Sequence, residues 1–565
     1  MHRAANLFKL FTQASTRRNV FQKVVSSYSR IFQNGYSGSR GLLWLSGAVT
    51  VLASTAVLNQ RKLSLESAHQ PFKVEDNLPS KTQDKEESIS LPGALNSRKP
   101  SDVVESCFKE LLSLGLGERI TREEHELETH GSDISFHDKV LPDIVIYPQD
   151  TTEVSNILSI CNKYKMPVVA YGGATSLEGH ILPVRGGVVL DFSNMKRILR
   201  VNLQDMDVTV EPGISWNELN DYLRTYGLFF PPDPGAGASI GGMVATSCGG
   251  TNAVKYGTMK ENVLSLKVVL ADGRVIHTRQ RVRKSSAGYD LTHLFIGSEG
   301  TLGIVTEAVL KLHPIPESHG VAMCYFDEIE DATSAVIDVV RASIDCGRIE
   351  LMDDLMVKAV NKSEGLHLEE KPVLLFELAG STHAVNEQME KILRITKNHK
   401  GQNFEYATEP EKREELWRAR KDALWSAYSL RPDCELWTTD VCVPVSRLSE
   451  MIHYTKEDLR KTKIVAPLIA HAGDGNFHLV MLVKPNDKEE MKMVKAFNDR
   501  LVKRALSMEG TCTGEHGIGE GKREYLVTEL GKEAVELMRT IKQSFDPNGI
   551  LNPGKIFMPK ENLEN

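Results

Sequence analysis

Two histidines on either side of a short turn are the first residues whose spacing suggests chemistry. Residues 464–483 read IVAPLIAHAGDGNFHLVMLV, so two apolar runs flank an Ala-Gly-Asp-Gly-Asn segment. An Asp-Gly step between such runs predicts a β-hairpin. The hairpin would place His471 at the end of one strand and His478 at the start of the next, where both imidazoles can bind one ion. Taken alone, the pair is also compatible with two unrelated strand histidines.

A second segment adds a carboxylate and a third imidazole. Residues 511–521 read TCTGEHGIGEG, with Glu515 and His516 between glycines. A charged pair in a glycine-rich turn is typical of a site that must reach a ligand. Two histidines and one carboxylate are a frequent ligand set for zinc or manganese, with positions left open for substrate. A further histidine, whose pKa lies near neutrality, suits a general base.

Two glycine-rich segments predict a bound phosphate-containing cofactor. A strand over 166–171 leads into Gly-Gly-Ala-Thr-Ser at 172–176, and residues 231–252 read PPDPGAGASIGGMVATSCGGTN. Small residues let backbone N–H groups approach an anion closely. We therefore expect the second segment to lie along an extended cofactor rather than in a packed core. A strict GxGxxG after a strand is missing from the sequence, so a Rossmann NAD site is not supported, and GILNPGK at 549–555 matches GxxxxGK by chance.

The surrounding pattern predicts the elements that position these segments. From about residue 130, strands and helices alternate. Residues 142–148 (PDIVIYP) form a short β-branched run, and residues 151–164 have apolar residues at helical spacing, with Thr151 or Thr152 as the N-cap. This alternation, followed by the hairpin, predicts an α+β protein.

Four blocks in order resemble the FAD-binding domain of the vanillyl-alcohol-oxidase type. They are YGGATSLEGH, PGAGASIGGMVATSCGG, the Tyr256-Gly-Thr-Met segment and GSEGTLGIVTE. The resemblance implies a two-part FAD-binding domain over 101–320, with the pyrophosphate between the glycine-rich loops. We expect noncovalent FAD, because the first loop has no histidine before His180 and the surroundings of Cys248 do not match those of covalent relatives. The implied cofactor-binding residues are Gly172, Gly173, Ala174, Thr175, Ser176, Pro234, Ala238, Ser239, Gly241, Gly242, Thr246, Gly249, Gly250, Glu299, Gly300, Ile304 and Asn552.

HAGDGNFH and GEHGIGEGK resemble the C-terminal domain of the FAD-linked 2-hydroxy-acid dehydrogenases, which include D-lactate, D-2-hydroxyglutarate and glycolate enzymes. The resemblance implies an α+β substrate- and metal-binding domain with an antiparallel sheet over 321–545. In it, His471, His478 and Glu515 would hold zinc or manganese, and His516 would be the base. Asn476, in the turn, is expected to donate to the substrate. The tail over 546–565 would return to the FAD domain.

An arginine is expected to bind the substrate carboxylate, because its planar fork matches that group. The family uses the helical stretch LWRAR for this purpose, which makes Arg420 the first candidate and Arg348 the second. The hydroxyglutarate enzymes carry an extra Thr and Lys near this arginine, and the corresponding positions here are Leu424 and Thr438. The pocket is therefore expected to be too apolar for a second carboxylate.

The stretch RPDCELWTTDVCVPVSRL is similar to the mitochondrial D-lactate branch of the family. We therefore expect FAD-dependent oxidation of D-lactate and related D-2-hydroxy acids to 2-oxo acids, with electrons passed to cytochrome c. Oxidation of D-2-hydroxyglutarate or glycolate is the alternative on the same scaffold. Two other classes remain open: a transferase resembling alkyl-glycerone-phosphate synthase, and a membrane-tethered flavin-binding module without turnover.

The N-terminal sequence predicts where in the cell the protein is located. None of the 75 acidic residues lies in residues 1–65, so the net charge of −7 combines a basic N-terminus with a strongly acidic remainder. An acidic body disfavours binding to nucleic acid. Residues 1–40 have the composition of a mitochondrial transit peptide. Uncharged residues 41–60 are long enough for a transmembrane or sorting segment, which suggests the inner mitochondrial membrane, or for a buried helix. Residues 61–100 are expected to form a linker.

The cysteines exclude two further classes. The eight cysteines are scattered along the chain and form no CxxC pair. This distribution argues against a disulfide scaffold and against a cysteine zinc site.

Overall fold

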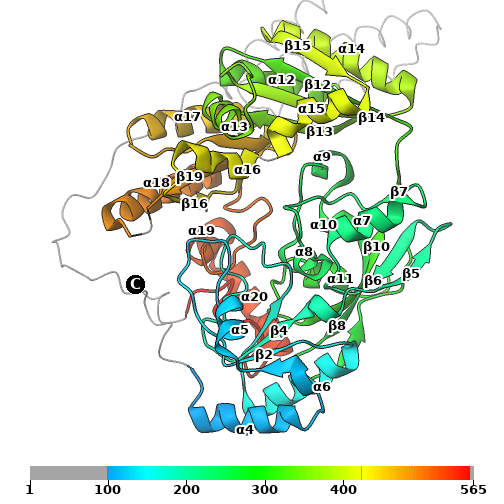
Figure 1. Ribbon diagram of the computed structural model, residues 1–565, viewed down its shortest axis with the longest axis vertical. Coiled ribbons are helices and arrows are strands. Elements are labelled where there is room, and N and C mark those ends of the chain that lie inside the picture. The colour runs from blue at the N-terminus through cyan, green and yellow to red at the C-terminus, as the bar shows by residue number, and fades with distance from the viewer. Residues whose placement is uncertain (1–97, 422, 485, 560–565) are drawn as a thin grey trace, which may run out of the picture. The chain divides into compact units, whose positions relative to one another are not determined.

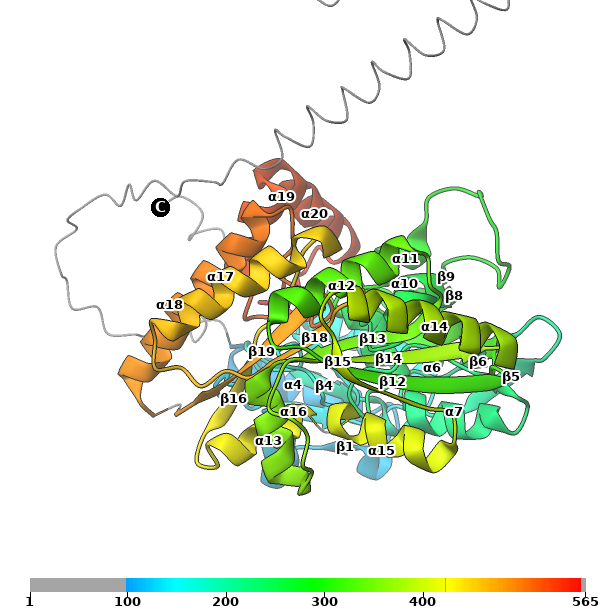
Figure 2. The same cartoon turned by 90° about the horizontal axis from the view of Figure 1, so that it is seen from above.

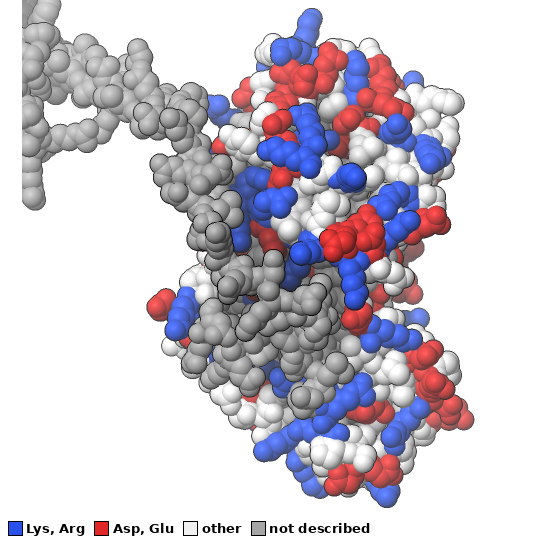
Figure 3. Space-filling model, turned by 90° about the vertical axis from the view of Figure 1, so that its left-hand side faces the viewer, with Lys and Arg blue, Asp and Glu red and all other residues white. Residues whose placement is uncertain are grey.

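The computed structural model describes residues 98–559, with the exception of residues 422 and 485 (Figure 1). The predicted transit peptide (1–40), the predicted membrane or sorting segment (41–60) and nearly all of the predicted linker lie outside the described residues. No helix within the described ranges is both long enough and apolar enough to span a bilayer. On the face shown in Figure 3, acidic and basic side chains are interspersed.

The first domain is built on two main sheets and a short two-stranded one, β7 (Leu228–Phe229) with β11 (His313–Pro314). The first main sheet has the strand order β1-β2-β4-β3. Strands β2, β4 and β3 are parallel, and β1 is antiparallel to β2. The elements are α4 (Ser101–Leu112), β1 (Ile120–Thr121), α5 (Glu124–Thr129), β2 (Ile144–Ile146), α6 (Thr151–Tyr164), β3 (Val168–Tyr171) and β4 (Val188–Asp191). Helix α6 has the predicted bounds. Its N-cap is Asp150 rather than Thr151 or Thr152, because the Asp150 carboxylate accepts the N–H groups of residues 152 and 153.

The second sheet of this domain is antiparallel, with the order β5-β6-β10-β8-β9. Its elements are β5 (Ile198–Asn202), β6 (Asp207–Val210), α7 (Trp216–Arg224), α8 (Ile240–Thr246), β8 (Val263–Val269), β9 (Val275–His277), α11 (Leu291–Phe295) and β10 (Ile304–Lys311). Helix α8 corrects one expectation for the glycine-rich segment 231–252. Ile240, Met243 and Val244 are buried in the core of this sheet, so part of the segment does pack.

The second domain is an antiparallel sheet in the order β15-β12-β14-β13-β18-β19-β16, with β17 beside β19. Its strands are β12 (Ser318–Tyr325), β13 (Cys346–Met352), β14 (Val373–Gly380), β15 (Gln402–Ala407), β16 (Glu435–Thr438), β17 (Val441–Cys442), β18 (Leu468–His471) and β19 (Asn476–Val483). Strands β18 and β19 form the predicted hairpin, with His471 paired to Asn476 and Ile469 to His478.

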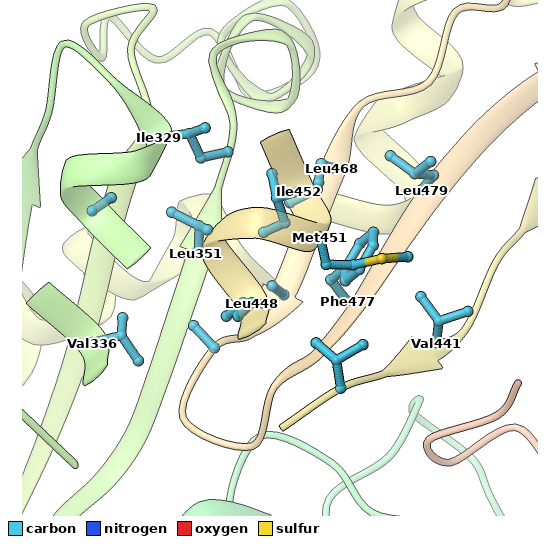
Figure 4. Close-up of a cluster of buried hydrophobic side chains, with 14 of the residues drawn as sticks. Ile329, Val336, Leu351, Val441, Leu448, Met451, Ile452, Leu468, Phe477 and Leu479 are labelled. Carbon is cyan, nitrogen blue, oxygen red and sulfur yellow. The ribbon is translucent and has the colours of Figure 1, made fainter. Parts of the chain in front are cut away.

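Helices cover both faces of this sheet (Figures 1 and 2). On one face lie α12 (Ile329–Arg341), α14 (Thr382–Asn398), α17 (Leu448–Arg460) and α18 (Lys488–Ser507), and on the other lie α13 (Asp354–Glu364), α15 (Pro410–Lys421) and α16 (Ala423–Ser426). Neighbouring residues of a strand face opposite layers: Phe376 packs in the first core and Leu375 in the second. Figure 4 shows the first core, where residues of α12 and α17 meet strand residues such as Leu351 and Phe477.

The chain finally returns to the first domain. After α19 (Leu526–Leu530), helix α20 (Lys532–Phe545) packs Ile541 and Phe545 against the core of the first domain's second sheet. Leu551 then forms a parallel bridge with Val168 of β3. The return therefore begins in α20, earlier than the predicted start of the tail at residue 546.

Candidate active site

The hairpin and the glycine-rich turn bring His471, His478 and Glu515 together. One ligand atom from each of these three side chains lies within 4.8 Å of the others. The Nε2 atoms of His471 and His478 are 3.1 and 3.4 Å from the same oxygen, Oε1 of Glu515. All three predicted ligands therefore converge on one point, at the end of the sheet where β18 turns into β19.

The other nitrogen of each imidazole is held by the protein. Nδ1 of His471 lies 2.9 Å from Oε1 of Glu350, and Nδ1 of His478 lies 3.0 Å from the carbonyl oxygen of Thr439. Glu350 is the direct cross-strand neighbour of His471, since β13 and β18 pair in this register. A proton on each Nδ1 satisfies these acceptors, so Nε2 is the nitrogen that each imidazole can offer to an ion beside Glu515. This is the tautomer that a metal ion requires.

The charges in the cluster are strongly coupled. Burial opposes protonation of His471, but Glu350 and Glu515 outweigh it and hold the pKa of His471 well above its ordinary value. Burial likewise opposes ionisation of Glu515, yet the two histidines keep the pKa of that carboxyl well below its usual range. A divalent ion would take the place of the His471 proton as the positive charge beside Glu515.

His516 stands next to this cluster. Its ring stacks on that of His478, with ring centroids 4.9 Å apart and planes 14° apart. Its Nδ1 is buried and has no hydrogen-bond partner among the described residues. Burial lowers the pKa of His516 to about 4. The imidazole is therefore neutral at physiological pH, but its pKa lies below the near-neutral value predicted for the base.

A second set of three possible ligands, Asp440, His478 and His516, also lies within 4.8 Å. Two observations favour the first set. The carboxylate of Asp440 already accepts hydrogen bonds from a side-chain hydroxyl, a side-chain amide and two backbone N–H groups. In addition, the only His478 nitrogen near it, Nδ1 at 3.7 Å, faces the carbonyl oxygen of Thr439. Asp440 therefore has little capacity left for an ion.

Arg420 lies on α15 with its side chain buried beside Glu350. Its Nε and Nη2 are both 2.7 Å from Oε2 of Glu350, the carboxylate that also receives His471. One carboxylate thus orients both the candidate substrate-binding arginine and a candidate metal ligand. Nη1 of Arg420 takes no part in this ion pair and is left to bind an anion.

Arg348 and Asn476, which were predicted to bind substrate, donate hydrogen bonds to other protein groups instead. Nε, Nη1 and Nη2 of Arg348 donate to Asn252, Glu377 and Asp233 respectively. The guanidinium lines the cavity described below, but each of its nitrogens is already engaged. The structure contradicts the prediction for Asn476 more clearly. It does not line the cavity, and its amide nitrogen donates to Oδ1 of Asp440 and to the Val441 carbonyl.

A single cavity of about 930 Å³ connects the glycine-rich segments with the histidine cluster. His471, His478, Glu515, His516, Arg348 and Arg420 line it. So do these predicted cofactor-binding residues: Gly172, Gly173, Ala174, Thr175, Ser176, Pro234, Ala238, Ser239, Gly241, Gly242, Thr246, Gly250, Glu299, Gly300, Ile304 and Asn552. Gly249 does not line it, but a Cβ at Gly249 would lie 2.9 Å from Oε2 of Glu515. The two predicted sites are therefore parts of one site.

The lining fits an elongated cofactor such as FAD. The loops at 172–176 and 235–239 pack directly on each other: a Cβ on Gly173 would overlap the Gly237 carbonyl oxygen, and Gly173 N donates to Ser239 Oγ. In contrast, a Cβ at Gly235 or Gly300 would meet no protein atom within 4 Å. Asn552 Oδ1 is buried with no hydrogen-bond partner in the described part of the chain. A bound cofactor would fill the open space beside these glycines and would give the buried acceptor a hydrogen-bond partner.

Sequence reasoning missed the residues that hold the cluster in place. Glu350, Asp440 and Lys522 are all buried, and no role was predicted for any of them, although Lys522 ends the GEHGIGEGK motif. The available signal was a charged residue within an apolar strand run, as in RIELM around Glu350 and TTDVCVP around Asp440. Charged residues are almost never fully buried unless they are paired. Charged residues at such positions therefore indicate buried ion pairs, which can support a functional site.

Comparisons with known proteins agree with this geometry. Residues 142–279 match the family model described as FAD binding domain, and residues 315–556 match that of FAD linked oxidases, C-terminal domain. A mitochondrial D-lactate dehydrogenase [cytochrome] of Arabidopsis thaliana is 50% identical over 446 residues, 79% of each chain. The glycolate oxidase subunit GlcD of Bacillus subtilis is 38% identical over 421 residues, 74% of this chain and 89% of that one.

Solved structures share the fold at low identity. p-Cresol methylhydroxylase with substrate bound has a TM-score of 0.67 at 18% identity, and the match covers 82% of this chain and 98% of that chain. Alkyldihydroxyacetonephosphate synthase has a TM-score of 0.62 at 20% identity, and the match covers 81% of this chain and 86% of that chain. At such identities the likeness concerns the fold alone.

The architecture is that of a flavin-dependent oxidoreductase, with an FAD-binding domain of the vanillyl-alcohol-oxidase type and a second, antiparallel domain that completes its cavity. Within that class, the chain belongs to the FAD-linked oxidase family that contains the mitochondrial cytochrome-type D-lactate dehydrogenases. The resemblance inferred from HAGDGNFH and GEHGIGEGK is thereby confirmed.

Proposed function

We propose that the protein oxidises D-lactate and related D-2-hydroxy acids to 2-oxo acids with noncovalently bound FAD. The observation that carries this proposal is the single cavity that joins the glycine-rich loops to the histidine and carboxylate cluster. FAD, when bound, supplies the acceptor for the hydride equivalent from the substrate carbon. The identity of 50% to a D-lactate dehydrogenase [cytochrome] supports this substrate class.

The residues of the second domain divide the remaining tasks. His516, neutral and next to the cluster, accepts the proton of the substrate hydroxyl. Nη1 of Arg420 binds the substrate carboxylate, while Nε and Nη2 stay on Glu350. His471, His478 and Glu515 would hold a zinc or manganese ion, which lowers the free energy of an alkoxide as it does that of hydroxide.

Two uncharged residues in the cavity support a small, singly charged acid. Leu424 and Thr438 line the cavity, and the family resemblance places them at the positions of the extra Thr and Lys of the hydroxyglutarate enzymes. Thr438 Oγ1 is buried and unpartnered among the described residues, and neither residue is able to neutralise a second carboxylate. Oxidation of D-2-hydroxyglutarate or glycolate is the alternative, which the B. subtilis glycolate oxidase relative supports.

The relatives also support an electron acceptor and a cellular location. The words cytochrome and mitochondrial in the names of several relatives support cytochrome c as electron acceptor and the mitochondrion as the location. Attachment to the inner membrane through residues 41–60 is part of the same proposal and rests on the sequence pattern alone.

Anaerobic bleaching of the bound flavin tests the proposal. The purified flavoprotein is mixed with D-lactate, L-lactate, glycolate and D-2-hydroxyglutarate, and the loss of absorbance near 450 nm is followed. We expect D-lactate to reduce the flavin fastest and L-lactate at least about 100-fold more slowly. Equal rates with both enantiomers would contradict the proposal. A flavin that no hydroxy acid reduces would favour the transferase or the flavin-binding module.

Two further measurements test the assigned roles. His516→Gln should keep its FAD but lose about 100-fold or more in the rate of flavin reduction, because the proton acceptor is gone. EDTA should remove activity that Zn²⁺ or Mn²⁺ restores. Normal turnover by metal-free protein would show that His471, His478 and Glu515 do not form a functional metal site.

A further inference from the structure

One buried carboxylate outside the cavity contacts the segment that carries both Glu515 and His516. Asp440 lies between β16 and β17, which both pair with β19, so the sheet fixes its position. Its side chain is fully buried and does not line the cavity. None of the roles proposed above uses it.

The two oxygens of Asp440 have separate partners. Oδ2 accepts hydrogen bonds from the backbone N–H of Glu515 at 3.0 Å and of His516 at 2.9 Å, and from Thr513 Oγ1 at 2.7 Å. Lys522 Nζ lies 3.5 Å from the same oxygen. Oδ1 accepts from the amide of Asn476, at the start of the strand that carries His478. One carboxylate thus connects residues 513–516, which include the proposed base, to the hairpin of β18 and β19.

Little else fixes the backbone at this point. Glycines precede and follow the Glu515–His516 pair, and Gly517 has a φ of +82°. The next fixed amides are those of Ile518 and Gly519, which donate to the carboxylate of Glu299 in the first domain. On the other side, Thr511 is paired with Cys442 of β17. The amides of residues 515 and 516 therefore depend on Asp440, whereas those of 518 and 519 depend on Glu299.

We propose that Asp440 is a positioning residue that places Glu515 and His516 relative to His471 and His478. This inference rests on the proposed function of His516 as the base. A displacement of about 1 Å in a reacting group can cost about 100-fold in rate. Replacing Asp440 by Asn would turn an amide NH₂ toward the amide NH₂ of Asn476, or turn it toward the N–H groups of residues 515 and 516. Either orientation sets donors against donors.

The first test measures the rate constant of flavin reduction in Asp440→Asn by stopped flow with D-lactate. We expect about a 30- to 100-fold lower rate constant at nearly full bleaching amplitude, with a KM changed by less than threefold. A purely structural role would instead lower the amplitude, since fewer molecules would be active, and leave the rate constant unchanged. A rate constant within threefold of wild type overturns the proposal.

Asp353→Asn is the matched control. Asp353 is an equally buried aspartate of the same domain that caps α13, accepts from the N–H groups of Met356 and Leu468, and pairs with Lys456. It does not line the cavity. We expect this variant to be less stable but to reduce its flavin at the wild-type rate constant. If D353N slows reduction as much as D440N, the effect is general and the proposal fails.

Hydrogen exchange gives a second readout that needs no substrate. In D440N flavoprotein, the amides of residues 515 and 516 should exchange at least about tenfold faster, while those of residues 518 and 519 keep their protection. Unchanged exchange at 515 and 516 overturns the proposal. Because this measurement is independent of turnover, it still decides the role of Asp440 if no hydroxy acid bleaches the wild-type protein and the proposed function fails.

A milder variant tests the proposal if D440N does not fold. Thr513→Val removes one donor to Asp440 Oδ2 and leaves the carboxylate in place. We expect a three- to tenfold lower rate constant and faster exchange at residues 515 and 516. A wild-type rate constant together with wild-type exchange in T513V contradicts the proposal.

Discussion

At the residue scale, the orientation of the histidines depends on carboxylates that the substrate never meets. Glu350 receives His471 Nδ1 and two nitrogens of Arg420, so it sets a candidate metal ligand and a candidate substrate ligand at once. Burial alone would favour the protonated form of Glu350, but Arg420 and His471 keep its pKa below the usual range. The residue is therefore ionised, as both of its partners require.

Glu350→Gln tests this double role. An amide has one acceptor oxygen and presents an NH₂ donor to a partner that is itself a donor, so either His471 or Arg420 loses its acceptor. We expect 10- to 100-fold weaker metal binding, the usual effect of losing such an outer partner, and an increased KM for D-lactate. Metal content against a competing chelator and steady-state kinetics measure the two effects. Glu377→Gln, which touches Arg348 and not the cluster, should leave metal binding unchanged. Wild-type metal affinity in E350Q would contradict the role.

Gly173→Ala tests the contact between the two glycine-rich loops. The added Cβ would overlap the carbonyl oxygen of Gly237, which is backbone and cannot rotate away. The loops must separate, so we expect loss of most bound FAD, measured as the ratio of absorbance near 450 nm to that at 280 nm. Gly380→Ala is the control, because its Cβ would make an ordinary contact 3.5 Å from that of Ala384. Full FAD occupancy in G173A would show that the loops tolerate separation.

At the element scale, sequence patterns predicted what local periodicity determines. The helix over 151–164 and the hairpin that carries His471 and His478 follow from the spacing of apolar residues and from an Asp-Gly turn. The pairing of β13 with β18, which sets Glu350 opposite His471, joins residues 121 positions apart and leaves no local signal. Asn476 was misassigned for the same reason, since its acceptor Asp440 comes from another strand connection.

The link between α5 and β4 gives a pH-dependent prediction. His130 ends α5, and its two nitrogens lie 2.7 Å from the Glu126 carbonyl oxygen and 2.9 Å from Oδ2 of Asp191, at the end of β4. Two acceptors require two ring protons. Burial opposes protonation, but Asp191 and Glu126 outweigh it and raise the pKa of His130 above its ordinary value of 6.5. The stabilisation is therefore fully present below pH 6.5 and is lost as the pH rises through the raised native pKa.

His130→Asn should lower the free energy of unfolding by roughly 1.5–3 kcal/mol at pH 6, the range for hydrogen bonds to charged groups. The difference from wild type should shrink as the pH rises through the raised native pKa, because the wild-type imidazole then loses its charge. Denaturant titrations at several pH values measure this difference. His125→Asn, which changes an exposed histidine of the same helix, should have little effect at any pH. A difference that grows with pH would contradict the assignment.

At the scale of the whole molecule, the site exists only where the two domains meet. The cavity takes its glycines from one domain and its histidines from the other, and the segment 515–519 is held by Asp440 on one side and by Glu299 on the other. Arg348 makes a further connection. It extends from β13 of the second domain to Asp233 and Asn252 of the first, and its guanidinium lies 5.0 Å from the ring centroid of Trp417.

Replacing Arg348 by Met distinguishes a connection between domains from a substrate ligand. The substitution keeps much of the side-chain volume but leaves the largely buried carboxylates of Asp233 and Glu377 without the guanidinium that bridges them. Breaking a buried pair in this way costs about 3–5 kcal/mol. We therefore expect thermal unfolding of R348M to separate into two transitions and FAD to dissociate faster. Arg431→Met, which breaks a pair with Glu490 inside the second domain, should lower stability without separating the transitions.

If Arg348 instead binds the substrate carboxylate, R348M should raise the KM for D-lactate at least tenfold and leave the unfolding profile unchanged. Calorimetry and steady-state kinetics on the same preparation therefore separate the two roles. The engagement of all three guanidinium nitrogens by protein acceptors favours the connection between domains, because a substrate would have to displace Asn252, Asp233 or Glu377 to bind there. Arg420, with Nη1 outside its ion pair, does not require such a displacement.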